Sequence, residues 1–498
     1  MFGKNEEILK SAPYPFLTAL AVFITVYAFE LSHFTLSIDE EFNDNIIHTI
    51  SMGRWGHSFL KQLIFPEPFI PFFTEVLSFI LLSISCTIIT TTMGLSFKQS
   101  IFFSILYASM PQLAYQLQFL NQFDTLATSL LLSSVMVFLI IKKDGFILNI
   151  ILPSILLCIS ISIYQSVIFY PFSILIASIC IDATRNESKI SLYKVGFSFL
   201  ASSVTGLFLY AISTRIIQNI YNVNSDSYFT NMISWLHSSP TESIFILIGF
   251  IKGFLTFRTT YGLNIFSVSL LLLMLPLFTS LKNKTKYSFT AIALIFSAFT
   301  LNIIIGGALP ARAMTCLGVV FAASCVIGFS SLKDLKVMWL IPVVSILYGT
   351  SCASNLFYSE TIAYNKDYRL ATLIANDIST KINSSVEAPF KVYFYGGLDL
   401  NYNNKIENSD MFGTSFLNWD SGNSARISAF INRTGIANVI PVSFNDVKEN
   451  QNLINVAPIW PQKGSILVFS DIVVVKLGNT LGNCVNGTYK NIDPSRCL

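Results

Sequence analysis

The stretch PYPFLTALAVFITVYAFEL, Pro13 to Leu31, decides the fold class of this chain of 498 residues. A helix needs about 20 apolar residues to cross the hydrocarbon core of a bilayer. This run is long enough to span, and no small-residue cleavage site of the kind that ends a signal peptide follows it. We therefore predict that it is the first membrane helix and not a cleavable signal peptide.

The composition of the whole chain agrees with a membrane protein. Hydrophobic residues make up 53% of the chain, charged residues make up 12%, and the mean hydropathy is +0.61, whereas soluble domains carry about 25% charged residues. The net charge of +3 is too small to indicate a nucleic-acid partner. The expected fold class is a polytopic α-helical membrane protein, embedded in membrane lipid.

Further apolar runs extend the pattern to roughly eleven transmembrane helices. The ten additional spans are expected at 71–91, 100–114, 125–141, 146–163, 166–181, 195–215, 263–281, 287–305, 313–330 and 335–352.

The lysines orient these spans. Alternate short loops, such as SFKQS, IKKDG and LKNKTK, carry lysine, and lysine-rich loops stay in the cytoplasm. With the N-terminus inside, an odd number of spans places everything after Cys352 in the periplasm of a bacterium. An extra span within 216–262 would invert the later loops, so we expect interfacial helices there.

The tail differs in character from the apolar part. FKVYFYGG and GSILVFSDIVVVKLG are strand-like, and SARISAFINRTG predicts a short amphipathic helix that ends at Gly435. Alternating strands and helices predict a small α/β domain. We therefore expect a transmembrane domain at 1–352 and a periplasmic α/β domain at 353–498.

Two cysteines, Cys484 and Cys497, lie alone in this exported tail. An oxidising compartment permits them to form a disulfide. No cysteine or histidine spacing in the chain resembles a zinc site, so no metal site is predicted.

An acidic loop follows the first span, in LSIDEEFNDNIIHTISMGRWGH, Leu36 to His57. Ser37 and Glu40 have the spacing of a capping box, which explains the acidic cluster without chemistry. A helix over Ile38–Met52 would instead place Asp39 on its apolar face, where an ionised carboxylate needs a partner or a function. An extended loop would not single out Asp39. The helical interpretation makes Asp39 the first candidate for a general base and Glu40 the second.

Other polar residues on the same side suit a sugar or a phosphate. Amide side chains such as Gln122 pair well with sugar hydroxyls. Asp124 is either a further sugar contact or the N-cap of the next helix. The cations of the outer loops suit phosphate or sugar groups, although snorkelling and structural ion pairs are alternatives. These cations, with one adjacent aromatic residue, are Arg54 and Trp55, Lys252, Arg258 and Arg312.

No P-loop and no G-x-G-x-x-G fingerprint occurs in the chain. ATP and nucleotide sugars are cytoplasmic, whereas the candidate residues are expected on the outer side. A lipid-linked phosphosugar donor fits a site in that place.

The chain resembles the type-specific glucosyltransferases of bacterial serotype-converting clusters, the GtrII-like family. The resemblance rests on SIDEE followed by GRWG, on PARAM late in the membrane part, and on GTSFLNWDSGNSARISAFINRTG in the tail. It implies a GT-C type membrane glycosyltransferase of the inner membrane. Such enzymes take glucose from undecaprenyl phosphate and attach it to the O-antigen repeats of lipopolysaccharide in the periplasm, which causes serotype conversion.

The resemblance also implies partners and roles for particular residues. Family members work beside a flippase of the lipid donor and a cytoplasmic synthase that makes it. An acidic residue of the first outer loop is the usual base, which points to Asp39 or Glu40, and the late arginine is Arg312. The reaction is inverting and requires no cofactor, although a divalent cation would be compatible with it. Candidate donor-phosphate contacts are Arg312, Arg258 and Lys252; candidate acceptor or sugar contacts are Glu41, Arg54, Trp55, Gln122, Asp124, Trp419 and Asp420.

Two other functions fit parts of the pattern. A flippase or transporter of lipid-linked sugars would explain the spans, but it needs neither a periplasmic domain nor outer carboxylates. An O-antigen polymerase or ligase also acts outside the cytoplasm, but it commonly places its basic residues in one large loop, whereas this chain spreads its cations over three.

Overall fold

The computed structural model describes residues 13–42, 46–65, 67–185, 190–226, 228–256, 258–279, 281, 284–332, 336–398 and 404–481. The chain divides into two compact units. The first, which we call the membrane unit, comprises Met1–Ser32 and Thr49–Asn355. The second, which we call the tail unit, comprises His33–His48 and Leu356–Leu498. The acidic loop therefore belongs to the tail unit although it is close to the N-terminus in sequence.

Long apolar helices confirm the helical membrane class. Among the described residues, five helical stretches are long and apolar enough to cross a membrane, and four shorter apolar ones accompany them. The predicted total of eleven spans stays a prediction. The five long stretches are α6 (Pro71–Met93), α9 (Leu120–Lys142), η2 (Gln165–Phe169) with α11 (Tyr170–Ala183), α12 (Leu192–Ile220), and η6 (Lys336–Trp339) with α20 (Leu340–Ile382).

The shorter apolar helices lie where spans were expected. The four are α2 (Pro13–Val26), η1 (Ile147–Ile151) with α10 (Leu152–Ile163), η3 (Leu263–Ile265) with α16 (Phe266–Met274) and η4 (Leu275–Phe278), and α19 (Leu317–Ser331).

Several expected spans have a different form in the structure. The run expected at 100–114 is interrupted between α7 (Phe97–Ala108) and α8 (Gln112–Leu117). The span expected at 287–305 is divided into α17 (Lys284–Ser297) and α18 (Thr300–Ile305). The last expected span, 335–352, lies within α20, which continues to Ile382 as one helix of 43 residues. The remaining short helices up to Leu255 are α3 (Ala28–Ser32), α4 (Ile46–Ser51), α5 (Trp55–Leu63), α13 (Tyr228–Met232), α14 (Ser234–His237) and α15 (Pro240–Leu255).

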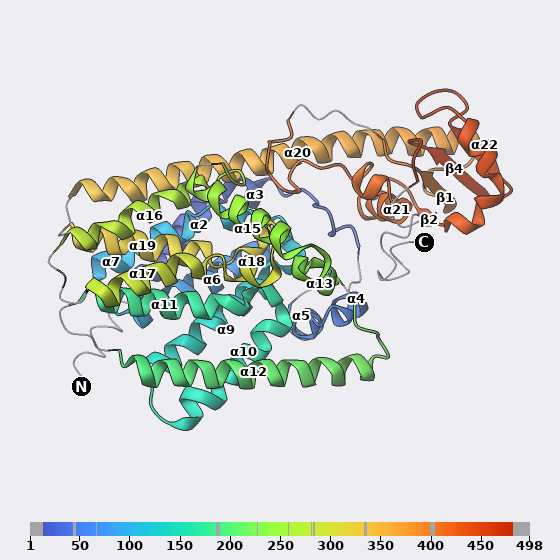
Figure 1. Cartoon of the computed structure of the whole chain (residues 1–498). Coiled ribbons are helices and arrows are strands. Elements are labelled where there is room, and N and C mark those ends of the chain that lie inside the picture. Colours follow the sequence, from blue (N-terminus) through green and yellow to red (C-terminus); the bar gives the residue numbers. More distant parts are fainter. Residues whose placement is uncertain are drawn as a thin grey trace. The chain divides into compact units, whose positions relative to one another are not determined.

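Small polar residues line the helix contacts of the membrane unit. Helix α9 packs against α6 and α10, and α10 packs in turn against α12 (Figure 1). At these contacts the hydroxyl oxygens of Ser85 and Ser134 lie 2.7 Å apart, and the hydroxyl of Ser160 lies 2.8 Å from those of both Ser129 and Ser133. Small hydroxyl residues let helices approach closely and bond across the interface, as is usual in membrane bundles.

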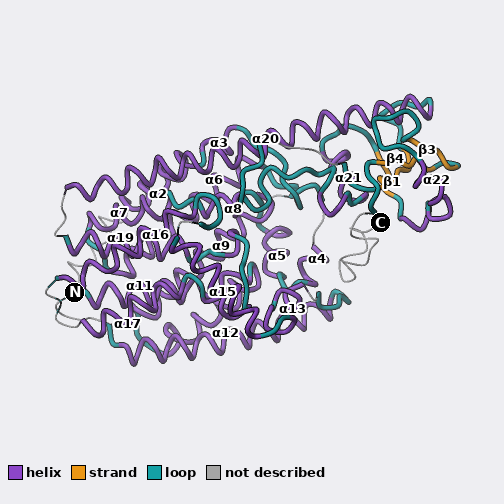
Figure 2. Tube along the Cα trace, turned by 45° about the horizontal axis from the view of Figure 1, so that its top comes forward, coloured by secondary structure: helices purple, strands orange, loops and turns teal. Residues whose placement is uncertain are grey.

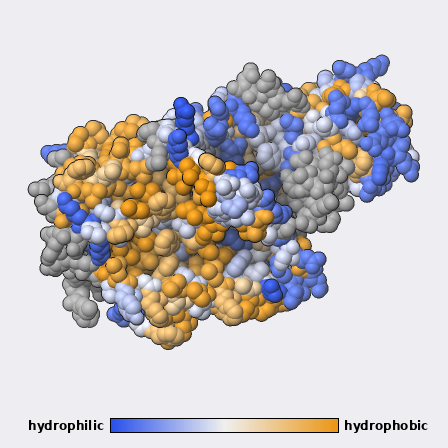
Figure 3. All heavy atoms as spheres, in the orientation of Figure 1, coloured by the Kyte–Doolittle hydropathy of each residue, from blue (hydrophilic) through white to orange (hydrophobic). Residues whose placement is uncertain are grey.

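The surface of the membrane unit is apolar over wide areas, shown in orange in Figure 3. Large side chains such as Phe197, Leu200 and Phe208 on α12 are at least 60% exposed. A continuous apolar surface of this kind is unusual for a protein surrounded by water. It is consistent with helices that face lipid.

The tail unit contains the four strands of the described residues, gathered in one sheet (Figure 2). The strand order is β2-β1-β4-β3, with β1 parallel to both β2 and β4, and β3 antiparallel to β4. Helix α21 (Ser424–Arg433) connects β1 to β2, which gives a β-α-β unit. The strands are β1 (Phe390–Tyr395), β2 (Val439–Pro441), β3 (Ile466–Phe469) and β4 (Ile472–Lys476).

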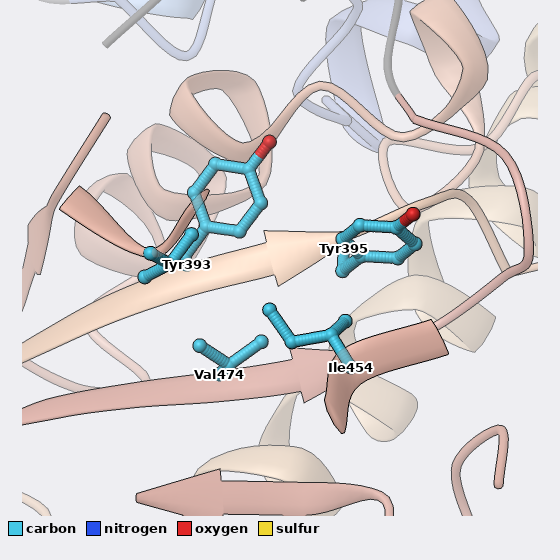
Figure 4. Packing of buried hydrophobic residues seen from close by; sticks show 5 residues of the cluster. Tyr393, Tyr395, Ile454 and Val474 are labelled. Atoms are coloured by element: carbon cyan, nitrogen blue, oxygen red, sulfur yellow. The ribbon is translucent and has the colours of Figure 1, made fainter. Parts of the chain in front are cut away.

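Figure 4 shows the hydrophobic core on one face of this sheet. Tyr393 and Tyr395 of β1 point to it together with Val474 of β4, which is the register partner of Tyr393. Ile454, from α22 (Gln451–Val456), covers them, and Val447 completes the buried cluster. Short helical turns elsewhere in the tail unit are η7 (Trp419–Ser421), η8 (Phe444–Asp446) and η9 (Lys448–Asn450).

Candidate functional site

The acidic loop is a turn and not the helix that the sequence predicted. The backbone N–H of Glu40 donates to the carbonyl of Ser37 at 3.0 Å, and Asp39 has a φ of +79°. Helix α4 begins only at Ile46. A helix over Ile38–Met52 is therefore wrong, because Asp39 adopts a left-handed conformation that aspartate tolerates in turns but that interrupts a helix.

The three carboxylates of this turn have different environments. The carboxylate of Glu40 is buried and accepts a hydrogen bond from the backbone N–H of Ser37 at 2.9 Å. This is the return bond of a capping box, used here to close a turn. The side chain of Glu41 is 0% exposed and pairs with Arg426. The side chain of Asp39 is 37% exposed, so it is the carboxylate of the three that solvent or a substrate reaches.

Arg426, in the first turn of α21, gathers the acidic residues of the tail unit. Its side chain is 7% exposed. One guanidinium nitrogen, Nη2, lies 3.0 Å from Asp39 Oδ1, Nη1 pairs with Glu41, and Nε lies 3.4 Å from Asp420 Oδ2. The guanidinium also lies over the ring of Phe42, 5.4 Å from its centre. Segments that are 385 residues apart in sequence thus meet at one side chain.

The electrostatics keep this arginine charged. Burial lowers the pKa of Arg426, but the negative charges of Glu41, Asp39 and Asp420 raise it by more, so the pKa lies above its ordinary value. One buried cation faces three carboxylates. The most exposed of the three side chains is that of Asp39.

A sharp turn around Asp420 leads into α21 and positions Arg426. Asp420 and Gly422 have φ values of +54° and +85°, and a Cβ at Gly422 would overlap the backbone of Gly396. Asn423 then caps α21, since its side-chain oxygen accepts from the backbone N–H of Arg426 at 3.2 Å. Only glycine fits position 422. The sharp turn there fixes where α21 begins and therefore where Arg426 lies.

A buried carboxylate on α20 holds the other end of the same loop. Asp367 is 0% exposed. It accepts hydrogen bonds from the Ser415 hydroxyl and from the Phe416 backbone N–H, both at 2.7 Å. Trp419 follows in η7 and is half-buried. The GTSFLNWDSGNSAR motif is thus anchored to α20 through Asp367 and leads into the first turn of α21, where Arg426 lies.

Sequence reasoning identified Asp39, Glu41 and Asp420 as candidates but missed Arg426. The structure brings these four residues together. The motif that contains Arg426 is part of the family resemblance in the sequence. However, nothing in one sequence indicates which arginine of an amphipathic helix turns inward to meet a distant loop.

In the membrane unit, Asp124 forms a buried ion pair. Its Oδ2 lies 2.9 Å from Lys61 Nζ, and the two side chains are 1% and 4% exposed. Glu67 lies 3.3 Å from the same nitrogen. Helix α9 begins at Leu120, so the N-cap interpretation of Asp124 is wrong. Its carboxylate ties α5 to α9.

Arg54 and Trp55 lie at the start of α5. Arg54 Nε donates to Gln165 Oε1 at 3.0 Å, and its guanidinium lies 4.9 Å from the centre of the Tyr164 ring. The indole N–H of Trp55 is buried without a hydrogen-bond partner among the residues that the structure describes. Gln122, one turn into α9, is half-buried. Lys61, the partner of Asp124, lies in the last turn of the same helix α5.

Arg312 lies in an irregular segment that follows Gly306 and Gly307 and contains Pro310. Helix α18 ends at Gly306 with a φ of +79°, and η5 (Ala311–Ala313) precedes α19. The guanidinium of Arg312 lies over the Phe119 ring, 5.1 Å from its centre. Gln112 donates to the carbonyl of Ala311 at 3.0 Å and so holds the segment against α8. Arg312 is half-buried.

A small pocket lies beside this segment. It is lined by Tyr107, Gln112, Leu113, Gln116, Leu130, Thr315 and Gly318.

The other candidate cations, Lys252 at the end of α15 and Arg258 just after it, are exposed. The predicted disulfide partners Cys484 and Cys497 lie outside the described residues. Within the described part of the chain, no group of three or more histidine, cysteine, aspartate or glutamate side chains is placed to hold a metal ion.

Comparison with known proteins gives one clear match. The sequence model of the family described as Glucosyl transferase GtrII matches residues 28–332. The match covers more than half of the chain and includes the acidic loop, α5 and the Arg312 segment. Curated proteins show no match to the chain.

Proposed function

Because the chain belongs to the Glucosyl transferase GtrII family and is therefore a glucosyltransferase, we propose that it transfers glucose from undecaprenyl phosphate to the O-antigen repeats of lipopolysaccharide. The transfer takes place at the periplasmic side of the bacterial inner membrane and causes serotype conversion. The membrane-type helices support a substrate that is itself anchored in lipid.

The observation that carries this proposal is the exposed carboxylate of Asp39. Its two neighbours, Glu40 and Glu41, are buried and hold the turn and Arg426 respectively. Among the described carboxylates of the loop that follows the first apolar helix, Asp39 combines a 37% exposed side chain with a fixed position, 3.0 Å from Arg426 Nη2. A positioned carboxylate that solvent reaches is suited to take a proton from a hydroxyl group.

The mechanism follows from this role. Asp39 accepts the proton of an acceptor hydroxyl while the oxygen of that hydroxyl attacks the anomeric carbon of the donor. The bond between that carbon and the phosphate oxygen breaks, and undecaprenyl phosphate leaves with the electron pair. Direct displacement inverts the configuration, so a β-linked donor gives an α-glucoside.

The leaving phosphate needs a positive partner, and we assign that role to Arg312. Its guanidinium lies in a segment of irregular backbone, which at membrane depth is found buried in protein or lining a cavity. A planar guanidinium binds phosphate through paired hydrogen bonds and stabilises the charge that develops on it. The exposed Lys252 and Arg258 attract the same anionic head group. This scheme requires no metal ion.

The acceptor contacts are assigned to other residues. The half-buried Trp419 offers an aromatic face on which a sugar ring stacks, and Gln122 and Arg54 offer hydrogen bonds. Asp124 is better explained as the structural partner of Lys61, and Asp420 as a partner of Arg426, since both carboxylates are paired with cations and their side chains are only 1% and 10% exposed.

Donor supply completes the proposal. The donor is made by a cytoplasmic synthase and moved across the membrane by a flippase, which are expected functional partners.

The test is to express the protein together with these two activities and to determine the O-antigen structure by NMR. One glucose added to each repeat supports the proposal. A changed chain length without added glucose would indicate a polymerase or ligase. Transfer of glucose by the purified protein in detergent excludes a transporter, because transport forms no glycosidic bond.

A further inference from the structure

We propose that Arg426 is the positioning residue for the base Asp39, so that α21 of the tail unit takes part in the chemistry. The inference rests on the proposed function, because it concerns the group assigned as its base. It assigns a role to a residue of the tail that lies outside the 28–332 stretch matched by the family model.

The two terminal nitrogens of the guanidinium donate hydrogen bonds, and Nε lies within ion-pair distance of a third carboxylate. Nη2 faces Asp39, Nη1 faces Glu41 and Nε faces Asp420. The planar fork of arginine presents donors in fixed directions, whereas a lysine ammonium is a single point on a flexible stem. A lysine at this position would keep the charge but could not hold the three carboxylates in the same arrangement.

The surroundings show what these contacts fix. Asp39 lies in a turn, and Arg426 Nη2 donates a hydrogen bond of 3.0 Å to Asp39 Oδ1, which orients its carboxylate. Glu41 anchors the same arginine from the buried side of the loop. On the other side, Asn423 and the turn at Gly422 set the start of α21. Arg426 is therefore held in place by the tail motif, and it holds the carboxylate of Asp39 in turn.

A purely structural role is the competing explanation. Arg426 would then only neutralise Glu41 and Asp420, and its loss would unfold the tail unit. The two roles differ in kinetics. A positioning residue acts through Asp39, so its effect should fall on kcat and should vanish when Asp39 is already disabled.

The experiment compares four variants of the full-length protein in detergent: Arg426→Lys, Asp39→Asn, the double variant of these two, and Arg433→Lys as a matched change on the same helix. The measurements are kcat and KM with undecaprenyl phosphate-glucose, and the thermal unfolding midpoint. We expect Arg426→Lys to lower kcat by about 10²-fold, the loss typical of a group displaced by about 1 Å. Its KM for the donor should stay within about twofold, the double variant should be no slower than Asp39→Asn, and Arg433→Lys should match the wild type.

A charge-balanced variant guards against misfolding. Glu41→Gln with Arg426→Gln removes one buried charge of each sign, and this variant should unfold close to the wild-type midpoint yet have the same low kcat as Arg426→Lys. Full kcat in either folded variant would overturn the inference, as would losses that multiply in the Asp39→Asn double variant. Wild-type protein that transfers no glucose from this donor would overturn the proposed function and this inference with it, whereas active wild type with active Arg426 variants overturns the inference alone.

Discussion

Asp39 occupies a turn in which both neighbouring carboxylates are committed to structural contacts. Asp39→Asn keeps the shape of the side chain and removes the proton acceptor. We expect glucose transfer to fall by about 10²–10⁴-fold, the usual contribution of a general base, while the donor still binds. The measurement is the initial rate of transfer from undecaprenyl phosphate-glucose. Asp471→Asn is the control, because it removes an exposed carboxylate of the tail unit and should leave the rate unchanged.

Glu40 provides the contrast that identifies the base. Its carboxylate accepts the Ser37 N–H, and a glutamine oxygen can accept the same bond. Glu40→Gln should therefore retain most of the activity at a small cost in stability. An inactive but folded Glu40→Gln beside an active Asp39→Asn would move the base to Glu40.

The role of Arg312 as the contact for the donor phosphate can be tested separately from the role of the base. Arg312→Lys keeps the positive charge and loses the planar fork that matches phosphate. We expect weaker donor binding together with a fall in transfer rate of about 10²-fold, because the same contact stabilises the leaving group. Donor titration and single-turnover rates measure the two effects. Arg215→Lys, at an exposed position of α12, should change neither, and equal loss in both variants would count against a specific phosphate contact.

At the scale of elements, α5 is held to α9 by the buried Lys61–Asp124 pair. Asp124→Asn leaves the buried lysine with the more exposed Glu67 as its acidic partner among the described residues. The expected loss of stability is about 3 kcal/mol, at the low end for breaking a buried ion pair. Chemical unfolding in detergent measures it. Asp144→Asn is the matched control, because its pair with Lys194 is exposed and such pairs contribute about 0–1 kcal/mol. Equal losses in the two variants would contradict a structural role for the buried pair.

The elements also show what the sequence can predict and what it cannot. The lengths of apolar runs predicted α6, α9 and α12 well, because the thickness of the bilayer is a local constraint on each segment. The same rule predicted that the last span ends near residue 352. Helix α20 continues to Ile382 because helix formation does not require an apolar surface on all sides.

The acidic loop shows a different limit. Residues 38–52 have helical periodicity, yet Ser37 and Glu40 close a turn and Asp39 adopts a positive φ. The apolar face assigned to Asp39 was therefore wrong, although the structure leads to the same candidate through its exposure. The contact between Asp39 and Arg426 joins segments 387 residues apart, and no local pattern in a single sequence specifies such a pairing.

At the scale of the whole molecule, the orientation of the chain in the membrane decides whether any of these residues can meet a periplasmic substrate. The loops that carry lysine predict a cytoplasmic position for Lys143, at the end of α9, and a periplasmic position for the tail unit. A phosphatase reporter, which is active only outside the cytoplasm, should be active when fused near Asn408 and inactive near Lys143. Activity at Lys143 and none at Asn408 would invert every loop assignment. Asp39, which belongs to the same compact unit as Asn408, would then lie in the cytoplasm, where neither the flipped donor nor the exported O-antigen is available to it.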